Sequence, residues 1–268
     1  MAGQPQGMAY ATEPTAAGVY GAADRFVGRA LRTGGNLFQG AKVWTAPVLD
    51  DLHARLADGL APKSEGDRQT FGQRWDTQLG GAPDTTVQLA GELLFVHVLF
   101  AADLTAKTKR DLVYGTLTRA SAPATVPHDL DQALESGLAR TGIAFKTRRQ
   151  CQLCLLLDAV RTWRDLRAPM RRTLLDDPWA FKAWLFALPH DGAHAQREAL
   201  LHLVHPATFE PIVSPKMKTR IVQAFAENVP ADVSDVDEAL IWIREALTED
   251  HGEGFWFTAP GLVEHWRP

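Results

Sequence analysis

The chain repeatedly marks where helices begin and end, and it almost never alternates polar and apolar residues as a strand would. Two expected starts, Asp177-Pro178 and Ser214-Pro215, pair an N-capping side chain with a proline at the first helical position. Two expected stops, Gly80-Gly81 and Gly252, are glycines that suit a helix C-terminus. These signals predict an all-α fold: a multi-helix orthogonal bundle, open to a division into two helical subdomains.

Proline and small residues interrupt the helical pattern at 121–127, SAPATVP. We interpret this segment as a linker between an N-terminal helical subdomain, residues 21–120, and a C-terminal one, residues 128–268. Residues 1–20 are mainly Gly, Ala, Pro, Gln and Thr with little to bury, so we expect a disordered tail. A chain of 268 residues can bury one large core or two smaller ones.

Net charge, cysteine content and apolar runs indicate which partners and which cellular compartment suit this chain. The net charge of −4 gives the whole protein no attraction to nucleic acid or to an anionic membrane, so a DNA contact needs a local basic patch. Two cysteines, Cys151 and Cys154, fit a reducing cytosol. The apolar run 93–102 is too short to span a bilayer, and the N-terminus lacks the features of a signal peptide. We expect a cytoplasmic protein without a membrane partner.

No motif for catalysis or nucleotide binding is complete. The segment 35–42, GNLFQGAK, resembles a phosphate loop, but Ala41 separates the second glycine from Lys42 and no strand precedes it, so we expect a flexible connection. The single C-x-x-C has no second pair to complete a structural zinc site. We expect no catalytic residue, no metal, no cofactor and no hydrolysis of nucleotides.

Three polar residues recur every four positions on the helix expected over 193–204: His194, Glu198 and His202. This spacing places them along one side of the helix, where they could ligate a metal. His194 also lies seven residues before Leu201 and so shares the side that Leu201 needs for the core. We therefore predict that His194 is half-buried and hydrogen-bonded rather than bound to metal.

An arginine-rich segment follows at 147–172. It holds seven arginines against two aspartates, a net charge of about +5, and such density suits phosphate groups. The alternative is a solvated face paired with the acidic C-terminal helix, which holds Asp235, Asp237, Glu238, Glu245 and Glu249. The candidate nucleic-acid-binding residues are Arg148, Arg149, Arg161, Arg164, Arg171, Arg172, Lys216 and Lys218.

Four segments between 177 and 225 carry a family resemblance: DPWAFKAWLFALP, GAHAQREALLHLV, P-x-TFEPIVS and K-x-x-I-V-x-AF. Together with VWTAPVLDDLHARL, TVQLAGELLFVHVLF and DVDEALIWIREALTEDHGEGFWF, they resemble the N-terminal region of McrB-like AAA+ restriction GTPases and ATPases. His205 and Met217 depart from that pattern, which has an aromatic residue and a histidine there. The resemblance marks a joint made of His194, Arg197, Glu198, His202, Phe209 and Ser214.

The resemblance implies a recognition module that binds a target, often modified DNA, in anti-phage defence. It also implies an AAA+ motor as partner, in cis or in trans, because such proteins continue into a phosphate-loop domain. Two functions follow: a module that binds nucleic acid for the motor, or a protein-interaction module that senses a partner. A remote third is a metal-dependent hydrolase around His194, Glu198 and His202. A basic surface favours the first function, an exposed apolar patch the second and a deep pocket the third.

Overall fold

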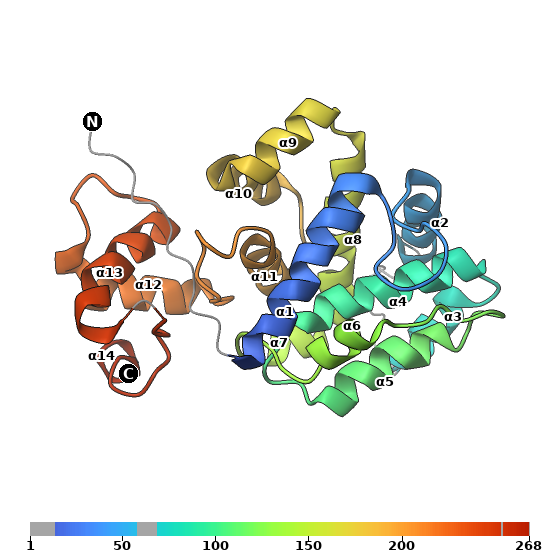
Figure 1. Cartoon of the computed structure of the whole chain (residues 1–268), viewed down its shortest axis with the longest axis horizontal. Coiled ribbons are helices and arrows are strands. Elements are labelled where there is room, and N and C mark those ends of the chain that lie inside the picture. Colours follow the sequence, from blue (N-terminus) through green and yellow to red (C-terminus); the bar gives the residue numbers. More distant parts are fainter. Residues whose placement is uncertain (1–13, 58–68, 253, 268) are drawn as a thin grey trace.

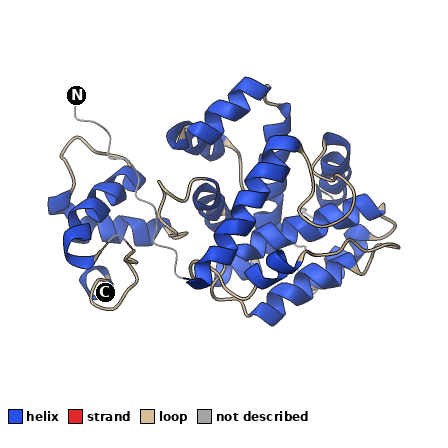
Figure 2. Cartoon of the chain, viewed as in Figure 1, coloured by secondary structure: helices blue, strands red, loops and turns tan. Residues whose placement is uncertain are grey.

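The structure is a computed structural model that describes residues 14–57, 69–252 and 254–267. Over these residues the fold is an all-α bundle, as predicted, with fourteen α-helices and no strand (Figure 2). Two isolated β-bridges, Gln39–Thr125 and Ala101–Ala139, connect loops. The predicted caps are present: Asp177 accepts from the amides of Trp179 and Ala180, and Ser214 accepts from the amide of Met217.

The first eleven helices form one body around α4. Helix α4 is buried over fourteen of its sixteen residues, which explains why its sequence is apolar on all sides. Helices α2, α5 and α8 pack directly against it. The elements of this body are α1 (Pro14–Arg25), the π-helical η1 (Phe26–Leu31), α2 (Ala46–Ala57), α3 (Phe71–Leu79), α4 (Asp84–Leu99), α5 (Ala106–Leu117), α6 (His128–Ala133), α7 (Gly142–Thr147), α8 (Arg149–Asp165), α9 (Ala168–Asp176), α10 (Pro178–Ala187) and α11 (His194–Val204).

A smaller C-terminal unit lies at one end of the molecule, opposite α2 and α3 (Figure 1). It consists of α12 (Pro215–Ala224), the 3-10 turn η2 (Ala226–Asn228), α13 (Val236–His251) and α14 (Val263–Trp266). It has a hydrophobic cluster of its own, which includes Phe225, Leu240, Ile243 and Trp266. The large cluster of the first body runs from Ala16 to Val213 and includes residues on both sides of 121–127. The predicted linker therefore does not separate two hydrophobic cores.

Two local expectations change. Residues 14–20, predicted to belong to a disordered tail, form the first turns of α1, where Val19 is fully buried; residues 1–13 lie outside the described residues. Aspartate is a favoured N-cap residue, so the sequence predicts Asp84 as the cap of α4, but Pro83 occupies the N-cap position. The Asp84 carboxylate instead accepts from the amides of Ser121 and Ala122, which ties the start of the predicted linker to α4.

Candidate functional site

The joint marked by the family resemblance, from His194 to Ser214, lies where the two hydrophobic clusters meet, and it is surrounded by buried charges. Lys218 of α12 lies between Glu198 of α11 and Asp237 of α13, with its Nζ 2.5 Å from Glu198 Oε2 and 2.6 Å from Asp237 Oδ1. Lys182 of α10 extends the network to Asp237 Oδ2 at 2.7 Å and to Asp235 Oδ1 at 2.5 Å. All but Asp235 are buried. Ion pairs therefore connect the C-terminal unit to the first body.

The charges in this network set one another's ionisation. Burial alone would lower the pKa of Lys218, but Asp237 and Glu198 raise it above its ordinary value. Burial would likewise raise the pKa of Asp237, but Lys218 and Lys182 hold it below its usual range. Both groups are thus charged at neutral pH, and each has its counter-charge within the protein.

A second buried pair and a buried histidine complete the joint. Arg244 of α13 donates to both carboxylate oxygens of Glu210, and its guanidinium carbon lies 4.2 Å from the centre of the Phe255 ring. His202 Nδ1 lies 2.6 Å from the carbonyl oxygen of Phe209 and therefore carries the proton, since a carbonyl only accepts. The Tyr20 hydroxyl then donates to His202 Nε2 at 3.2 Å. Burial lowers the pKa of His202 to about 4, so the ring is neutral.

The predicted line of His194, Glu198 and His202 does not act as one site. Glu198 and His202 face inward and have the partners given above. His194, predicted to be half-buried, is exposed because it begins α11 ahead of the part that the core covers; its ring contacts that of His190 at 4.5 Å between centroids. In the described part of the chain, no three His, Cys, Asp or Glu residues come together as a metal site would require.

The remaining joint residues have structural contacts. Arg197 places its guanidinium carbon 3.9 Å from the centre of the Phe186 ring. Phe209 is buried, with its ring edge-on to Trp179 at 5.4 Å, and Ser214 caps α12. The joint as a whole therefore holds the two units together, and its polar groups are largely engaged within the protein.

The predicted nucleic-acid-binding residues do not form a single surface. Lys218 is 1% exposed between two carboxylates, so it cannot reach a phosphate, which corrects that expectation. Arg161 is paired with Asp50 at 2.8 Å, and the Arg149 guanidinium lies over the Phe71 ring at 5.0 Å. Arg148 lies near Gly192 at the far end of α8, and Lys216 is exposed on the C-terminal unit.

Pairing of the arginine-rich segment with the acidic C-terminal helix, the alternative considered from the sequence, is wrong for the described residues. Asp235 and Asp237 pair instead with Lys182 and Lys218. Within 148–172, Arg161 has its partners in α2 and α8, at Asp50 and Asp158. The acidic helix α13 therefore does not neutralise Arg164 at the end of α8 or Arg171 and Arg172 on α9.

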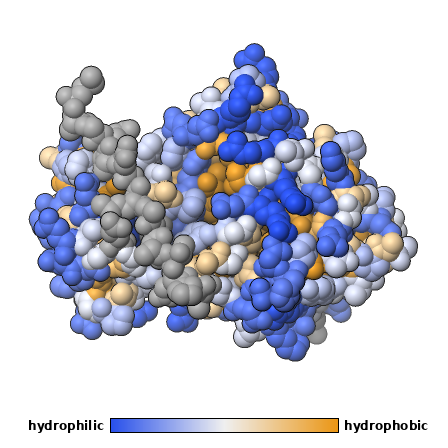
Figure 3. Space-filling model, viewed as in Figure 1, coloured by the Kyte–Doolittle hydropathy of each residue, from blue (hydrophilic) through white to orange (hydrophobic). Residues whose placement is uncertain are grey.

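Three of the predicted arginines lie near Arg167 of the same arginine-rich segment, and the fold adds Arg29 and Arg32. We call the set the arginine surface: Arg29, Arg32, Arg164, Arg167, Arg171 and Arg172. It lies where the end of η1 meets the connection from α8 to α9, a hydrophilic area of the face in Figure 3 (Figures 1 and 3). Arg171 Nη1 lies 3.5 Å from the Arg164 carbonyl oxygen. A Cβ on Gly34, just beyond Arg32, would lie 3.4 Å from Arg164 Cζ.

The six members of the arginine surface lack acidic partners, whereas many other arginines of the described chain have one. Arg25, Arg55, Arg110, Arg119 and Arg244 each pair with a carboxylate. Among the described residues, none of the six members of the arginine surface has a carboxylate oxygen within 4.0 Å. Asp165, exposed between Arg164 and Arg167, is the acidic residue nearest to them in sequence. The sequence pattern missed Arg29 and Arg32 because only the tertiary fold brings η1 to the end of α8.

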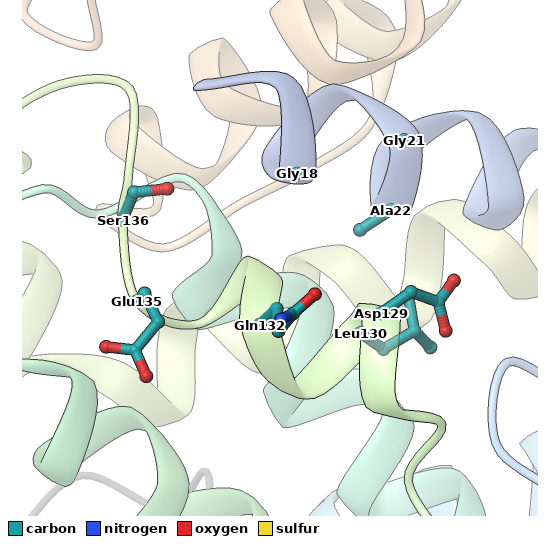
Figure 4. Close-up of a pocket in the computed structure, with 8 residues that line it drawn as sticks. All are labelled: Gly18, Gly21, Ala22, Asp129, Leu130, Gln132, Glu135 and Ser136. Carbon is teal, nitrogen blue, oxygen red and sulfur yellow. The ribbon is translucent and has the colours of Figure 1, made fainter. Parts of the chain in front are cut away.

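A groove of about 490 Å³ lies between α1 and α6, and its charged side chains are paired with arginines (Figure 4). Asp129 and Glu135 lie at its two ends, with Gln132 between them. Asp129 pairs with Arg25 at 2.5 Å, and Glu135 pairs with Arg110 at 2.6 Å. The rest of its lining is small or uncharged, so the groove offers no set of groups for acid–base or metal chemistry.

Comparisons with known proteins give no relative: no protein-family model, curated protein or solved structure matches this chain significantly. The resemblance to McrB-like proteins therefore stays a prediction. No described helix combines the length and the apolar character needed to cross a bilayer. Among the described residues, the large apolar side chains that are well exposed are Tyr114, Ile143 and Met170, which belong to three different helices.

Proposed function

We propose that this chain is a non-catalytic recognition module that binds the phosphate backbone of nucleic acid, DNA in the first place, through the arginine surface. The observation that carries the proposal is the set of six arginines without an acidic partner among the described residues, in a protein of net charge −4. Proteins neutralise phosphates with such clusters and gain affinity from the release of condensed counterions. The guanidinium group also matches phosphate geometry with two parallel hydrogen bonds.

The resemblance to McrB-like proteins supports the rest of the proposal: a cytoplasmic module of a restriction system, working with an AAA+ motor. In this arrangement the arginine surface holds the nucleic acid, and the joint keeps the C-terminal unit in a fixed position relative to it. The protein-interaction module remains the alternative, since an arginine-rich surface also suits an acidic protein partner.

Binding to a DNA duplex at several salt concentrations tests the proposal. The logarithm of the affinity should fall linearly with the logarithm of the salt concentration, with a slope of about 0.9 per neutralised phosphate. The triple variant Arg29→Gln, Arg167→Gln, Arg172→Gln should bind more weakly and with a smaller slope. A matched variant removes three exposed cations elsewhere, Lys107→Gln, Arg140→Gln and Arg220→Gln, and should bind as the parent does.

Two results would contradict the proposal. One is the absence of duplex binding at low salt by the folded protein. The other is an equal loss of affinity in the two triple variants, which would mean that net charge, rather than the arginine surface, attracts the nucleic acid.

A further inference from the structure

Arg149, Arg164 and Arg197 are half-buried, and the Nε atom of each is buried without a hydrogen-bond partner in the described part of the chain. For two of them an aromatic ring takes the place of a partner: Phe71 lies under Arg149 at 5.0 Å, and Phe186 lies under Arg197 at 3.9 Å. Such cation–π contacts offset part of the cost of burying the charge. Arg164 has no described ring against it, and its neighbour is a second cation, Arg171.

The position of Arg164 is fixed by its surroundings. The indole Nε1 of Trp163 donates to the carbonyl oxygen of Leu31 at 2.9 Å and holds the end of α8 against η1. Gly34, with a φ of 69°, lies directly beside the guanidinium, since a Cβ there would be in van der Waals contact with Nη2 at 3.5 Å. Nε and Nη2 are both buried there without acceptors among the described residues, so Nη1 is the nitrogen left for a ligand.

The charge on Arg164 is therefore uncompensated in the free protein. Burial, and after it the charge of Arg171, lower its pKa to about 10, which still leaves it protonated at neutral pH. A half-buried cation beside a second cation destabilises the fold unless an anion joins them. The positive charge of a guanidinium is shared over its three nitrogens, so an anion at the accessible Nη1 would offset the charge of the whole group.

We infer that Arg164 and Arg171 form a discrete phosphate-binding site at the centre of the arginine surface. This inference rests on the proposed function for its biological ligand, a backbone phosphate of nucleic acid. The exposed edge of the Arg164 guanidinium and the Arg171 side chain would donate to the phosphate oxygens. The other members of the arginine surface would attract the strand through longer-range charge. Arg164 should thus contribute more affinity than an exposed arginine of the same surface.

Thermal unfolding with inorganic phosphate tests the site without nucleic acid. Phosphate should raise the melting temperature of the parent by about 2–4 °C over chloride at equal ionic strength. Arg164→Met should unfold at a temperature equal to or above that of the parent, because it removes an uncompensated charge. The same variant should lose most of the phosphate-specific rise. Arg172→Met, an exposed arginine of the same surface, is the matched control and should keep that rise.

Duplex binding by the same variants separates the two proposals. Arg164→Met should weaken binding about tenfold, the effect expected for a charge-assisted hydrogen bond, and Arg172→Met should weaken it less. Equal losses together with an unchanged phosphate response would overturn the Arg164 site and leave the proposed function in place. A phosphate-specific rise that depends on Arg164, without any duplex binding, would uphold the site and overturn the proposed function.

Discussion

Lys218 shows how two lysines on one helix can differ completely in environment. Lys216 and Lys218 both belong to the first turn of α12, yet Lys216 is exposed and Lys218 is 1% exposed. Two positions along a helix point about 200° apart, so one faces solvent while the other faces the joint. The carboxylates that receive Lys218 come from α11 and α13, about twenty residues away on either side. The sequence carries no local signal for this pairing.

We predict that Lys218→Met lowers the free energy of unfolding by about 3–5 kcal/mol, because it leaves Glu198 and Asp237 buried near each other with less counter-charge. Urea unfolding at neutral pH measures the change. Lys216→Met, at the exposed position two residues earlier, should stay within about 0.5 kcal/mol of the parent. If the two variants unfold at the same urea concentration, the buried ion pairs do not stabilise the joint.

At the scale of the element, the sequence predicts the helix ends that depend only on neighbouring residues. The caps at Asp177 and Ser214 and the stop at Gly252 depend on neighbouring amides and on backbone freedom, and each is present. The segment 35–42 depends on a distant residue instead. It was expected to be a flexible connection, yet Leu37 and Phe38 are buried. Their amides donate to the carboxylate of Glu92 in the middle of α4, at 2.8 and 3.1 Å.

We predict that Glu92→Gln loosens this segment. The carboxylate also accepts from Trp44 Nε1 at 2.6 Å and from Gln88 Nε2 at 2.9 Å. Glutamine would replace one of the two acceptor oxygens with an NH₂ group, and the donors that face this group would lose their acceptor. A buried donor left without a partner costs about 1–3 kcal/mol. Hydrogen exchange should show faster exchange of the Leu37 and Phe38 amides. Glu245→Gln, at an exposed position of α13, should leave those rates unchanged; a similar change in both variants would refute the role of Glu92.

For the molecule as a whole, apolar patterns predict the helices but not how charges are shared between them. The sequence predicts correctly that Glu198 and His202 lie on one helix. Their partners come from three other parts of the chain: Lys218 pairs with Glu198, and Tyr20 and the Phe209 carbonyl hydrogen-bond to His202. The arginine surface arises in the same way, since Arg29 and Arg32 reach it through the packing of η1 against the end of α8. Both candidate regions are therefore products of tertiary contacts.

Two buried histidines should make the stability of the whole molecule depend on pH. Burial, only partly offset by hydrogen bonds, lowers the pKa of His97 to about 3 and that of His202 to about 4. Between these values and about 6.5, the unfolded chain binds protons that the folded chain does not. The free energy of unfolding should therefore fall as the pH is lowered through this range, by up to about 1.4 kcal/mol per pH unit for each histidine.

Urea unfolding between pH 7 and pH 5 measures this dependence. His202→Gln removes one of the histidines whose pKa burial lowers, a set that also includes His205, and should reduce the slope of stability against pH, whatever its effect on stability at pH 7. His194→Gln changes an exposed histidine and should leave the slope as in the parent. A slope unaffected by His202→Gln would contradict the lowered pKa of His202 in the folded protein.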